Sequence, residues 1–553
     1  MSRETTYLLS YDIGSTGCKT CLYELSGSLR LVDGALEEYP LLTVDGDGVE
    51  QSPEDWWRAM VLTTRKIMET RPGLSISGIS FCAQMQGLVL VDEDLSPLRP
   101  AMSYMDQRSL KQKADILEHG LQVEGMNFGK LLKSLAVNGA VSASVKDPVW
   151  KYKWVEENEP EIFARIHKWL DVKDYLIARA TGICSMTADS AFATFLTEKK
   201  TDHRSWSTAL LRMYGVNPDH MPKIVDSTDT VGHLREEQAL ELGLSAGIPV
   251  FGGGGDASMI SVGAGATRTG DAYVYIGTSG WMALNVNRPK VDLGRRIAAI
   301  TGAQRNRYMY FAEQETAGKC LEWVRDHLAL DEIDMYLDAL HVADNPESEY
   351  ESLYEFLMDS IAAVPAGAGG VIFAPWLHGN RAPFDDPDSR GIFFNLSLST
   401  GKRAMIRAVV EGILFHQKWL MESIEHSFPV NGQIGFVGGG ALSRSTSQLL
   451  ADILERPVKR MTDPRHAGAA GAAITMGIGL GLIDSFDEAP NFLEVQDIFM
   501  PNPENQAAYR RNYTVFKNLY RSNSRNFARL NSEAFASEAA SGPKESRKQP
   551  IPV

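Results

Sequence analysis

The sequence predicts an α/β protein made of two related halves, and three observations support that prediction. A short phrase, Asp-Ile-Gly-Ser-Thr-Gly at residues 12–17, returns in altered form as Tyr-Ile-Gly-Thr-Ser-Gly at residues 275–280. Apolar runs stand on both sides of each copy, which is the pattern of two strands joined by a tight turn. Strand-like and helix-like segments alternate along the chain. At 553 residues the chain exceeds the usual size of one core, so two domains are expected.

The first half is expected to begin with a sheet and a capped helix. Short apolar segments predict strands around residues 7–13, 18–25, 28–33, 77–82 and 88–91. Ser52 before Pro53, with an acidic residue at the third helical position, predicts the start of a helix. A long helical region is expected from about Gln107, and a further helix from Trp150 to near Pro160.

The second half is expected to start near Ile248 and to repeat this alternation. We predict strands around residues 248–251, 272–276, 281–286 and 434–437. We predict helices over residues 315–328, 351–362 and 402–426. Beyond Ala489 the chain is expected to be helical, and the polar stretch from Ser532 predicts a disordered tail. The predicted organisation is a first domain over residues 1–247, a second domain over residues 248–490, a helical extension over residues 491–531 and a tail over residues 532–553.

Composition and charge are those of an ordinary soluble globular protein. The chain is 44% hydrophobic and 23% charged, and its net charge of −15 argues against a nucleic-acid or anionic-membrane surface. Five cysteines and the lack of an apolar N-terminal segment predict a cytoplasmic protein. Cys18 and Cys21 form a CxxC pattern, but residues three apart on a strand point to opposite faces, so buried thiols are expected. The uncharged stretch 467–483 is shorter than a membrane span and is expected to form an internal helix and turn.

The two repeated turns are candidate phosphate-binding sites. Tight turns of Gly, Ser and Thr expose backbone N–H groups and add hydroxyl donors, which suits phosphate oxygens. Two such turns in one chain predict two walls that face one phosphate chain. The alternative is a pair of ordinary hairpin turns, because short glycine motifs are common.

Two aspartates stand at positions where a carboxylate has a chemical use. Asp256 follows a glycine run and opens a Gly/Ala-rich helix, so it could accept a proton from a substrate hydroxyl during phosphoryl transfer. Asp12 ends the first strand, where a carboxylate could hold Mg²⁺ against phosphates. The alternatives are a helix N-cap for Asp256 and a turn-stabilising residue for Asp12.

Three further loops carry polar or glycine-rich motifs. Residues 438–441 follow a strand and offer a backbone platform for a planar base, or simply a tight turn without a ligand. Residues 84–87 and 106–108 combine amide, carboxylate and guanidinium groups, which suit a polyhydroxylated substrate. Each of these two loops is also compatible with a surface loop.

Taken in order, these motifs resemble the FGGY family of carbohydrate kinases, and within it the xylulokinases. The resemblance covers roughly residues 7–485, and it rests on the order of many short motifs that are individually weak. The motifs are Asp12–Gly17, Gln84–Gly87, Met105–Arg108, Pro148–Trp154, Gly253–Asp256, Gly277–Gly280, Gly391–Leu396, Arg407–Gly412 and Gly438–Ala441.

The resemblance implies a fold and an activity. The fold is two ribonuclease-H-like domains of the actin-like ATPase type, with the active site in the cleft between them. The activity is ATP-dependent and Mg²⁺-dependent phosphorylation of a sugar hydroxyl, on a ketopentose such as D-xylulose to give xylulose 5-phosphate. The partners are the sugar and ATP, with no nucleic acid and no membrane, and the family makes a homodimer the expected assembly.

The resemblance also implies roles for individual residues. Asp256 would be the general base and Asp12 would bind Mg²⁺. The sugar would be bound by Met85, Gln86, Asp106, Arg108 and Asp256. ATP would be bound by Gly14, Ser15, Thr16, Gly17, Lys19, Gly277, Thr278, Ser279, Gly439, Gly440 and Arg444.

There are three departures from the family pattern, and the one at Gln86 leaves the sugar open. Xylulokinases usually carry a histidine where this chain has Gln86. Lys146 stands where a small or aromatic residue is usual, and Arg465-His466-Ala467 stands where relatives often have an acidic residue. The alternative acceptors are ribulose, gluconate, erythritol or a glycerol-like polyol.

Two other classes of function remain as hypotheses. One is a non-catalytic, kinase-like sugar sensor, which the presence of Asp256 disfavours. The other is an ATPase that acts on protein partners, which the long segments between the first turn and Asp256 disfavour.

Overall fold

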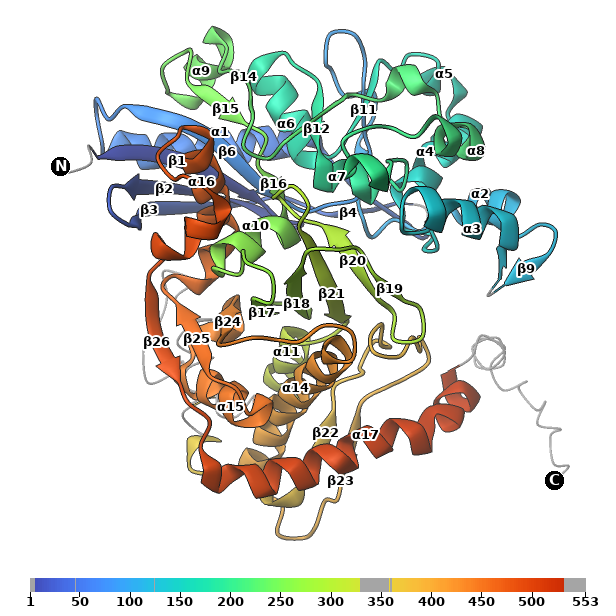
Figure 1. Cartoon of the computed structure of the whole chain (residues 1–553), viewed down its shortest axis with the longest axis vertical. Helices are drawn as coiled ribbons and strands as arrows, with labels where there is room; N and C mark the ends of the chain where they lie inside the picture. The colour runs from blue at the N-terminus through green and yellow to red at the C-terminus, as the bar shows by residue number, and fades with distance from the viewer. Residues whose placement is uncertain (1–4, 45, 124, 329–357, 359–360, 532–553) are drawn as a thin grey trace, which may run out of the picture.

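Two β-sheets, one in each half of the chain, form the framework of the protein (Figure 1). The computed structural model describes residues 5–44, 46–123, 125–328, 358 and 361–531. The first sheet has the order β14-β15-β6-β1-β2-β3, with β16 also paired to β6. Its strands are β1 Thr6–Ile13, β2 Gly17–Leu25, β3 Leu29–Glu38, β6 Ile76–Ala83, β14 Thr230–His233, β15 Pro249–Phe251 and β16 Gly254–Gly255.

The second sheet repeats the central part of the first. Its order is β19-β20-β21-β18-β17-β24-β25-β26. In the first sheet, β1 pairs antiparallel with β2 and parallel with β6. In the second sheet, β17 likewise pairs antiparallel with β18 and parallel with β24. The strands are β17 Ala272–Ile276, β18 Gly280–Val286, β19 Val291–Asp292, β20 Ile297–Thr301, β21 Tyr308–Gln314, β24 Ile434–Val437, β25 Val458–Met461 and β26 Val495–Phe499. The repeated phrase in the sequence therefore marks a repeated supersecondary structure.

Short strand pairs and helices complete the two halves. The short strands are β4 Leu42–Val44, β5 Gly48–Gln51, β7 Val89–Val91, β8 Ala101–Met102, β9 Gln122–Val123, β10 Met126–Asn127, β11 Lys168–Leu170, β12 Ser185–Thr187, β13 Lys223–Val225, β22 Ile372–Ala374 and β23 Ile392–Phe394. The helices are α1 Pro53–Glu69, α2 Leu110–Leu117, α3 Phe128–Val137, α4 Pro148–Asn158, α5 Pro160–Phe163, α6 Val172–Thr181, α7 Ala188–Ala193, α8 Thr208–Tyr214, α9 Glu236–Leu242, α10 Asp256–Gly263, α11 Gly318–His327, α14 Lys402–Glu425, α15 Arg444–Leu454, α16 Ala467–Gly479 and α17 Pro503–Asn531.

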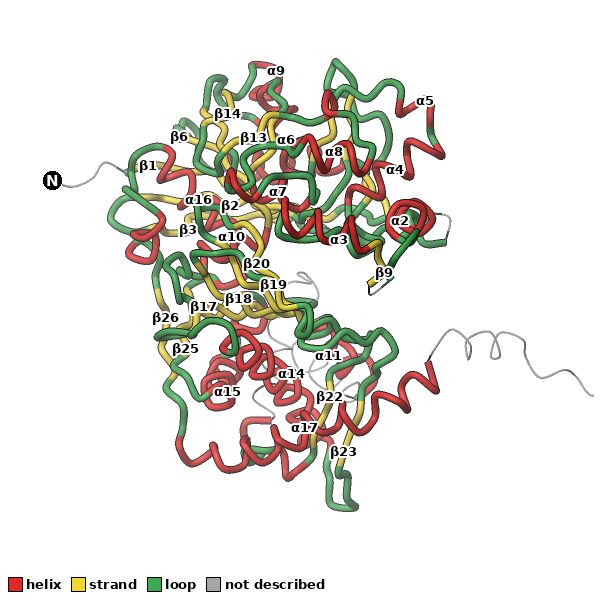
Figure 2. Tube along the Cα trace, turned by 45° about the vertical axis from the view of Figure 1, so that its right-hand side comes forward, coloured by secondary structure: helices red, strands yellow, loops and turns green. Residues whose placement is uncertain are grey.

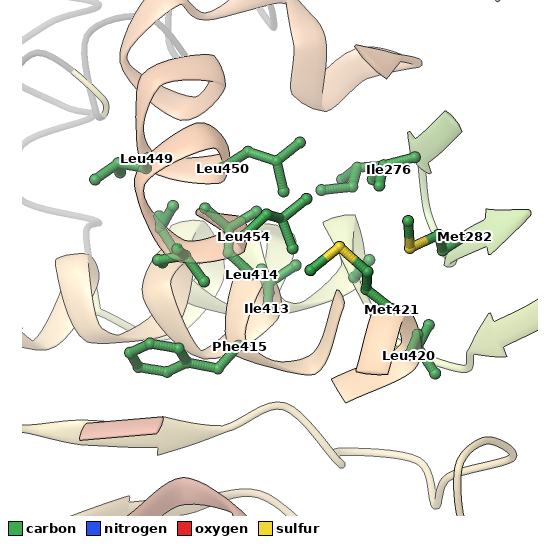
Figure 3. Close-up of a cluster of buried hydrophobic side chains, with 14 of the residues drawn as sticks. Ile276, Met282, Ile413, Leu414, Phe415, Leu420, Met421, Leu449, Leu450 and Leu454 are labelled. Atoms are coloured by element: carbon green, nitrogen blue, oxygen red, sulfur yellow. The ribbon is translucent and has the colours of Figure 1, made fainter. Parts of the chain in front are cut away.

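Helices α14 and α15 pack against the second sheet and form its core (Figure 2). Leu414 and Met421 of α14 and Leu450 of α15 meet Ile276 and Met282 of the sheet (Figure 3). These side chains are at most 4% exposed, so their transfer from water stabilises this half through the hydrophobic effect. The outer helix α17 packs on α14, α15 and β22.

Helices α10 and α16 cross at two glycines and join the two halves. A Cβ atom added at Gly263 would lie 1.8 Å from the carbonyl oxygen of Ala467, and one at Gly471 would lie 1.9 Å from that of Met259. Helix α16 also packs on β1, β2 and β6 of the first sheet. Helix α16, although far along the sequence, therefore packs against β1, and its start lies near the end of that strand.

Four expectations need correction. Strands β15 and β16 pair with β6, so the predicted boundary at 247/248 cuts through the first sheet, and the change between sheets falls after α10. The region from Gln107 is two helices, α2 and α3, because Gly120 and Gly125 adopt positive φ values of 83° and 76° between them. The extension over 491–531 includes the strand β26, which pairs with β25, and is helical only from Pro503. Strand β3 extends to Glu38 rather than ending near residue 33.

Other expectations lie outside the described residues or are confirmed. The tail over 532–553 and most of the helix expected over 351–362 are not among the described residues. Cys18 and Cys21 are buried free thiols in two different core clusters, as their spacing on β2 predicts.

Candidate active site

The two Gly/Ser/Thr turns close equivalent hairpins, β1–β2 and β17–β18. In the first, the amide of Gly14 donates to the carbonyl oxygen of Gly17 at 2.9 Å. In the second, the amide of Gly277 donates to the carbonyl oxygen of Ser279, also at 2.9 Å. Both turns therefore have the tight geometry that leaves further N–H groups free for an anion.

Each turn is held in place by hydrogen bonds to its backbone carbonyl oxygens. The Tyr39 hydroxyl donates to the carbonyl oxygens of Gly14 and Gly17 at 2.6 and 3.0 Å, and Gln51 Nε2 donates to that of Ser15 at 2.7 Å. At the second turn, the amide of Gly318 donates to the carbonyl oxygen of Gly277 at 2.8 Å. A Cβ at Gly318 would lie 2.4 Å from that oxygen, so only glycine allows the start of α11 to approach this closely.

Tyr275 and Tyr104 connect the two turns to the two aspartates. Tyr275 precedes the second turn, and burial followed by the charges of Asp12 and Asp256 raises the pKa of its hydroxyl. For Tyr104, burial and then the charge of Asp256 raise the pKa, while a hydrogen bond with Ser15 of the first turn lowers it. The two turns and the two aspartates thus gather in one region, where α10 lies between the sheets (Figure 1).

Asp256 is the first residue of α10 and is held by the glycine loop before it. Gly253 has φ of 60°, and a Cβ there would lie 2.2 Å from the carbonyl oxygen of Phe81, so the loop needs glycine at this position. Oδ1 of Asp256 accepts from the amide of Ala257 at 2.7 Å, and no described residue donates a hydrogen bond to Oδ2. Gly255 is the N-cap residue of α10, so the alternative hypothesis that Asp256 serves as the N-cap is wrong.

The environment of Asp256 suits a proton acceptor. Burial is the main cause that raises the pKa of this carboxyl from 3.8 to about 7, and the negative charges of Asp12, Glu313 and Asp189 add to it. The hydrogen bond from Ala257 opposes the shift. A carboxyl group with a pKa near neutrality and one unengaged oxygen can take a proton from a hydroxyl group.

Asp12 lies at the end of β1 with a partly exposed carboxylate. Its Oδ2 is 4.0 Å from Nζ of Lys19 on the facing strand. A Cβ at Gly468, near the start of α16, would lie 2.6 Å from Sγ of Cys82 and 3.6 Å from Cγ of Asp12. Helix α16 is therefore packed against this carboxylate, which fixes the direction from which a ligand can approach.

The chemistry of Asp12 fits a magnesium ion that also binds phosphate. Within the part of the chain that the structure describes, no three or more His, Cys, Asp or Glu side chains gather as a metal site. Mg²⁺ commonly binds through one or two carboxylates together with waters and substrate phosphates, so a single carboxylate beside two candidate phosphate-binding turns is compatible with it.

The predicted sugar residues Met85 and Gln86 lie beside the loop that leads to Asp256. A Cβ at Gly255 would lie 2.2 Å from Sδ of Met85, so the two loops are in contact. Gln86 has φ of 64°, and its carbonyl oxygen accepts from Nζ of Lys151 at 2.8 Å. Its side-chain Nε2 donates to Oδ1 of Asp147 at 3.4 Å.

Asp106 and Arg108, also predicted to bind sugar, are bonded to each other and to β5. Asp106 is fully buried, and its Oδ2 accepts from Nη2 of Arg108 at 2.7 Å and from the amide of Val49 at 2.9 Å. Arg108 also pairs with Glu50. Both side chains therefore hold their loop against β5, and direct contact with a sugar remains a prediction.

The predicted nucleotide platform lies next to the second turn. Gly438 has φ of 89°, and Gly439 and Gly440 form a short 3₁₀ turn after β24. A Cβ at Gly440 would lie 2.8 Å from Ile276, which directly precedes Gly277. Arg444 begins α15, and its exposed guanidinium donates to Asp497 of β26 at 2.7 Å, so its predicted contact with ATP would require that pair to rearrange.

Sequence reasoning missed four residues of this region: Tyr104, Asp189, Glu313 and Arg381. Tyr104 stands directly before the motif Met105–Arg108, so its position in the sequence is the signal that could have included it. Asp189, Glu313 and Arg381 lie in segments without a motif. Only the tertiary structure brings Asp189 and Glu313 near Asp256, and Arg381 near Tyr104.

Comparison with known proteins identifies the family of this chain. Residues 7–263 and 272–480 match the N-terminal and C-terminal domains of the FGGY family of carbohydrate kinases. A gluconokinase of Bacillus subtilis (strain 168) is 29% identical over 519 residues, which cover 94% of this chain and 96% of that protein. A xylulose kinase of the same organism is 27% identical over 517 residues, covering 93% and 96%.

The fold is shared with solved structures. The crystal structure of a gluconate kinase from Lactobacillus acidophilus superposes with a TM-score of 0.80 at 24% identity, over 95% of this chain and all of that one. The predicted two-domain α/β fold of the actin-like ATPase type is confirmed. Among the described residues, no helix combines the length and apolar character needed to cross a membrane. Because the two domain matches together span most of residues 7–480, the chain belongs to the FGGY family of carbohydrate kinases.

Proposed function

We propose that this protein transfers the γ-phosphoryl group of ATP to a hydroxyl group of a sugar, with Asp256 as the general base. One observation carries the proposal. Asp256 has a pKa of about 7 and an unengaged Oδ2, and it is an electrostatic neighbour of Asp12 at the first phosphate turn and of Tyr275 at the second.

Each part of the site has a role in this reaction. Asp256 accepts the proton as the sugar oxygen attacks the γ-phosphorus, and the bond from phosphorus to the β–γ bridging oxygen breaks to release ADP. The turns at Gly14–Gly17 and Gly277–Ser279 hold the phosphates through backbone N–H groups, with Lys19 on the same side as Asp12. Asp12 would hold Mg²⁺, which supplies positive charge to the phosphate oxygens.

Two acceptors are the leading candidates. D-xylulose, giving xylulose 5-phosphate, is the acceptor that the resemblance to xylulokinases favours. Gluconate is the second, because Gln86 replaces the usual xylulokinase histidine and because a gluconokinase and a xylulose kinase are similar to this chain at nearly equal identity.

The test is ADP release with Mg-ATP across D-xylulose, D-ribulose, D-gluconate, erythritol and glycerol. We expect one acceptor or a small group to stimulate turnover, and we expect Asp256→Asn to lose two to four orders of magnitude in kcat, on the scale of a positioned general base. ATP hydrolysis that is indifferent to every acceptor would favour an ATPase that acts on proteins. Tight sugar binding without ADP formation would favour a sensor.

A further inference from the structure

Gln86 has a backbone conformation that a residue with a side chain rarely adopts. Its φ of 64° lies in the left-handed region, where the Cβ atom of an L-residue crowds the backbone. Such a conformation persists only when the surrounding structure holds it in place. The side chains that hold Gln86 therefore bear directly on what this residue can do.

The carboxyl group of Asp171 accepts hydrogen bonds from three backbone amides. Oδ2 accepts from the amide of Gln86 at 3.1 Å, and Oδ1 accepts from the amides of Gly87 at 2.9 Å and Val172 at 2.8 Å. Asp171 is 4% exposed and is the N-cap residue of α6. A Cβ atom at Gly87 would lie 2.9 Å from Cγ2 of Val172, so the loop and the start of α6 are in close contact. One buried side chain thus joins the loop to the helix.

Two further buried side chains engage the rest of Gln86. Nζ of Lys151 donates to the carbonyl oxygen of Gln86 at 2.8 Å, and Oδ1 of Asp147 accepts from Nε2 of Gln86 at 3.4 Å. Both side chains are buried. Among the residues that the structure describes, none donates a hydrogen bond to Oε1 of Gln86. The carboxamide therefore has its nitrogen engaged and its oxygen available as an acceptor.

The same loop touches the segment that carries the general base. A Cβ atom at Gly255 would lie 2.2 Å from Sδ of Met85, and Gly255 directly precedes Asp256. A displacement of the loop would therefore be felt next to Asp256. This contact places the residues that Asp171 holds within reach of the proposed reaction.

We propose that Asp171 is a positioning residue of this kinase, which fixes the backbone of Gln86 so that the Gln86 carboxamide oxygen accepts a hydrogen bond from a hydroxyl group of the acceptor. The inference deepens the function proposed above and rests on it. A carboxyl group suits the task because both of its oxygens accept, whereas an amide offers one oxygen and an NH₂ group that only donates. Holding the carboxamide in place before the acceptor binds lowers the entropy that binding must remove.

The experiment starts from Asp171→Asn. Asparagine matches aspartate in size and caps helices about equally well, so α6 should be retained. Its Nδ2 would stand in place of Oδ2 and face the N–H group of Gln86, two donors against each other. We expect KM for the acceptor to rise by roughly 10- to 50-fold while KM for Mg-ATP stays within about twofold. The acceptor is whichever of D-xylulose, D-ribulose, D-gluconate, erythritol and glycerol the wild-type protein turns over fastest, with ADP release as the readout.

A double-mutant cycle tests whether Asp171 acts through Gln86. If it does, adding Asp171→Asn to a Gln86→Ala variant should change the acceptor KM by less than about threefold, because the side chain to be positioned is already absent. A role in stability alone would give the same loss in both backgrounds.

The matched control is Asp92→Asn. Oδ1 of Asp92 accepts from the amides of Asp94 and Ser96, so an asparagine there keeps both bonds. This variant should leave both KM values at the wild-type level. Circular dichroism and the thermal midpoint check that every variant folds.

The outcomes separate the inference from the function on which it rests. An unchanged acceptor KM in Asp171→Asn, or an equal loss with and without the Gln86 side chain, would overturn the inference and leave the kinase function intact. A lower kcat with an unchanged acceptor KM and a lower thermal midpoint would assign Asp171 to the stability of α6 alone. No ADP formation by the wild-type protein with any acceptor would remove the proposed function, and the inference with it.

Discussion

The amide of Gly255 donates a hydrogen bond to Oδ2 of Asp189 at 2.8 Å, which ties the residue before Asp256 to a buried carboxylate. The other oxygen of Asp189 accepts from the Thr187 hydroxyl at 2.5 Å and from the Ser190 amide at 2.9 Å. Asp189 is 1% exposed and comes from a segment about 70 residues earlier. Asp189 is the acceptor in each of these hydrogen bonds. A carboxylate, which only accepts, therefore matches the site, whereas an amide, whose Nδ2 group only donates, does not.

Asp189→Asn should therefore act as a positioning mutation. The new Nδ2 group would face an N–H or O–H donor, so the loop at Gly255 should shift and kcat should fall by roughly 10- to 100-fold, with little change in KM. Because one negative neighbour of Asp256 is removed, the acid limb of kcat/KM should also move to lower pH. Steady-state kinetics from pH 5 to 9 measure both effects, with Thr187→Ser as a control that keeps the hydroxyl donor. A loss of activity with no movement of the limb would assign Asp189 a purely structural role.

The rate should depend on the ionisation of Asp256. Burial and negative neighbours raise its pKa to about 7, and only the ionised form accepts a proton. Activity should therefore be fully present above that value, and kcat/KM should fall about tenfold per pH unit below it. The pH profile with saturating Mg-ATP measures this limb, and Asp256→Asn should abolish it. A flat profile between pH 5 and 8 would exclude Asp256 as the titrating base.

The crossing of α10 and α16 should tolerate no added methyl group. In Gly471→Ala the new Cβ would lie 1.9 Å from the carbonyl oxygen of Met259, and backbone cannot yield as a flexible side chain can. We expect the free energy of unfolding to fall by about 3 kcal/mol, at the upper end for overpacking. Urea denaturation measures the change. Gly27→Ala is the matched control, because nothing lies within 4 Å of its added Cβ, and it should unfold at the wild-type urea concentration.

The need for magnesium should depend on Asp12. In Asp12→Asn the Mg²⁺ concentration that gives half-maximal activity at fixed ATP should rise about tenfold or more, because a neutral amide is a poorer ligand for a hard cation. Glu24→Gln is the control: it removes a carboxylate from the same hairpin, where Glu24 pairs with Arg30 away from the turn. Identical Mg²⁺ titrations for Asp12→Asn and the wild-type protein would contradict a role of Asp12 at the metal.

Local patterns were sufficient to predict the hairpins and the start of α10. The strands around 7–13 and 272–276 and the turns after them follow from apolar alternation and from turn residues, which act over a few positions. The helix start at Pro53 follows from local capping in the same way. Two features were not predicted: the break between α2 and α3, and the strand β26. The break depends on two glycines within a polar stretch, and β26 becomes a strand through its pairing with β25.

The sequence by itself determined which residues of this protein are candidates for the chemistry of a kinase: two Gly/Ser/Thr turns, the carboxylates of Asp12 and Asp256, and an ordered set of family motifs. The tertiary structure alone decided the environment of those residues. The pKa of Asp256 depends on its burial and on Asp12, Asp189 and Glu313, which are distant in the sequence. Charge interactions act through space and grow as water is excluded, so their outcome is set by which segments the fold brings together.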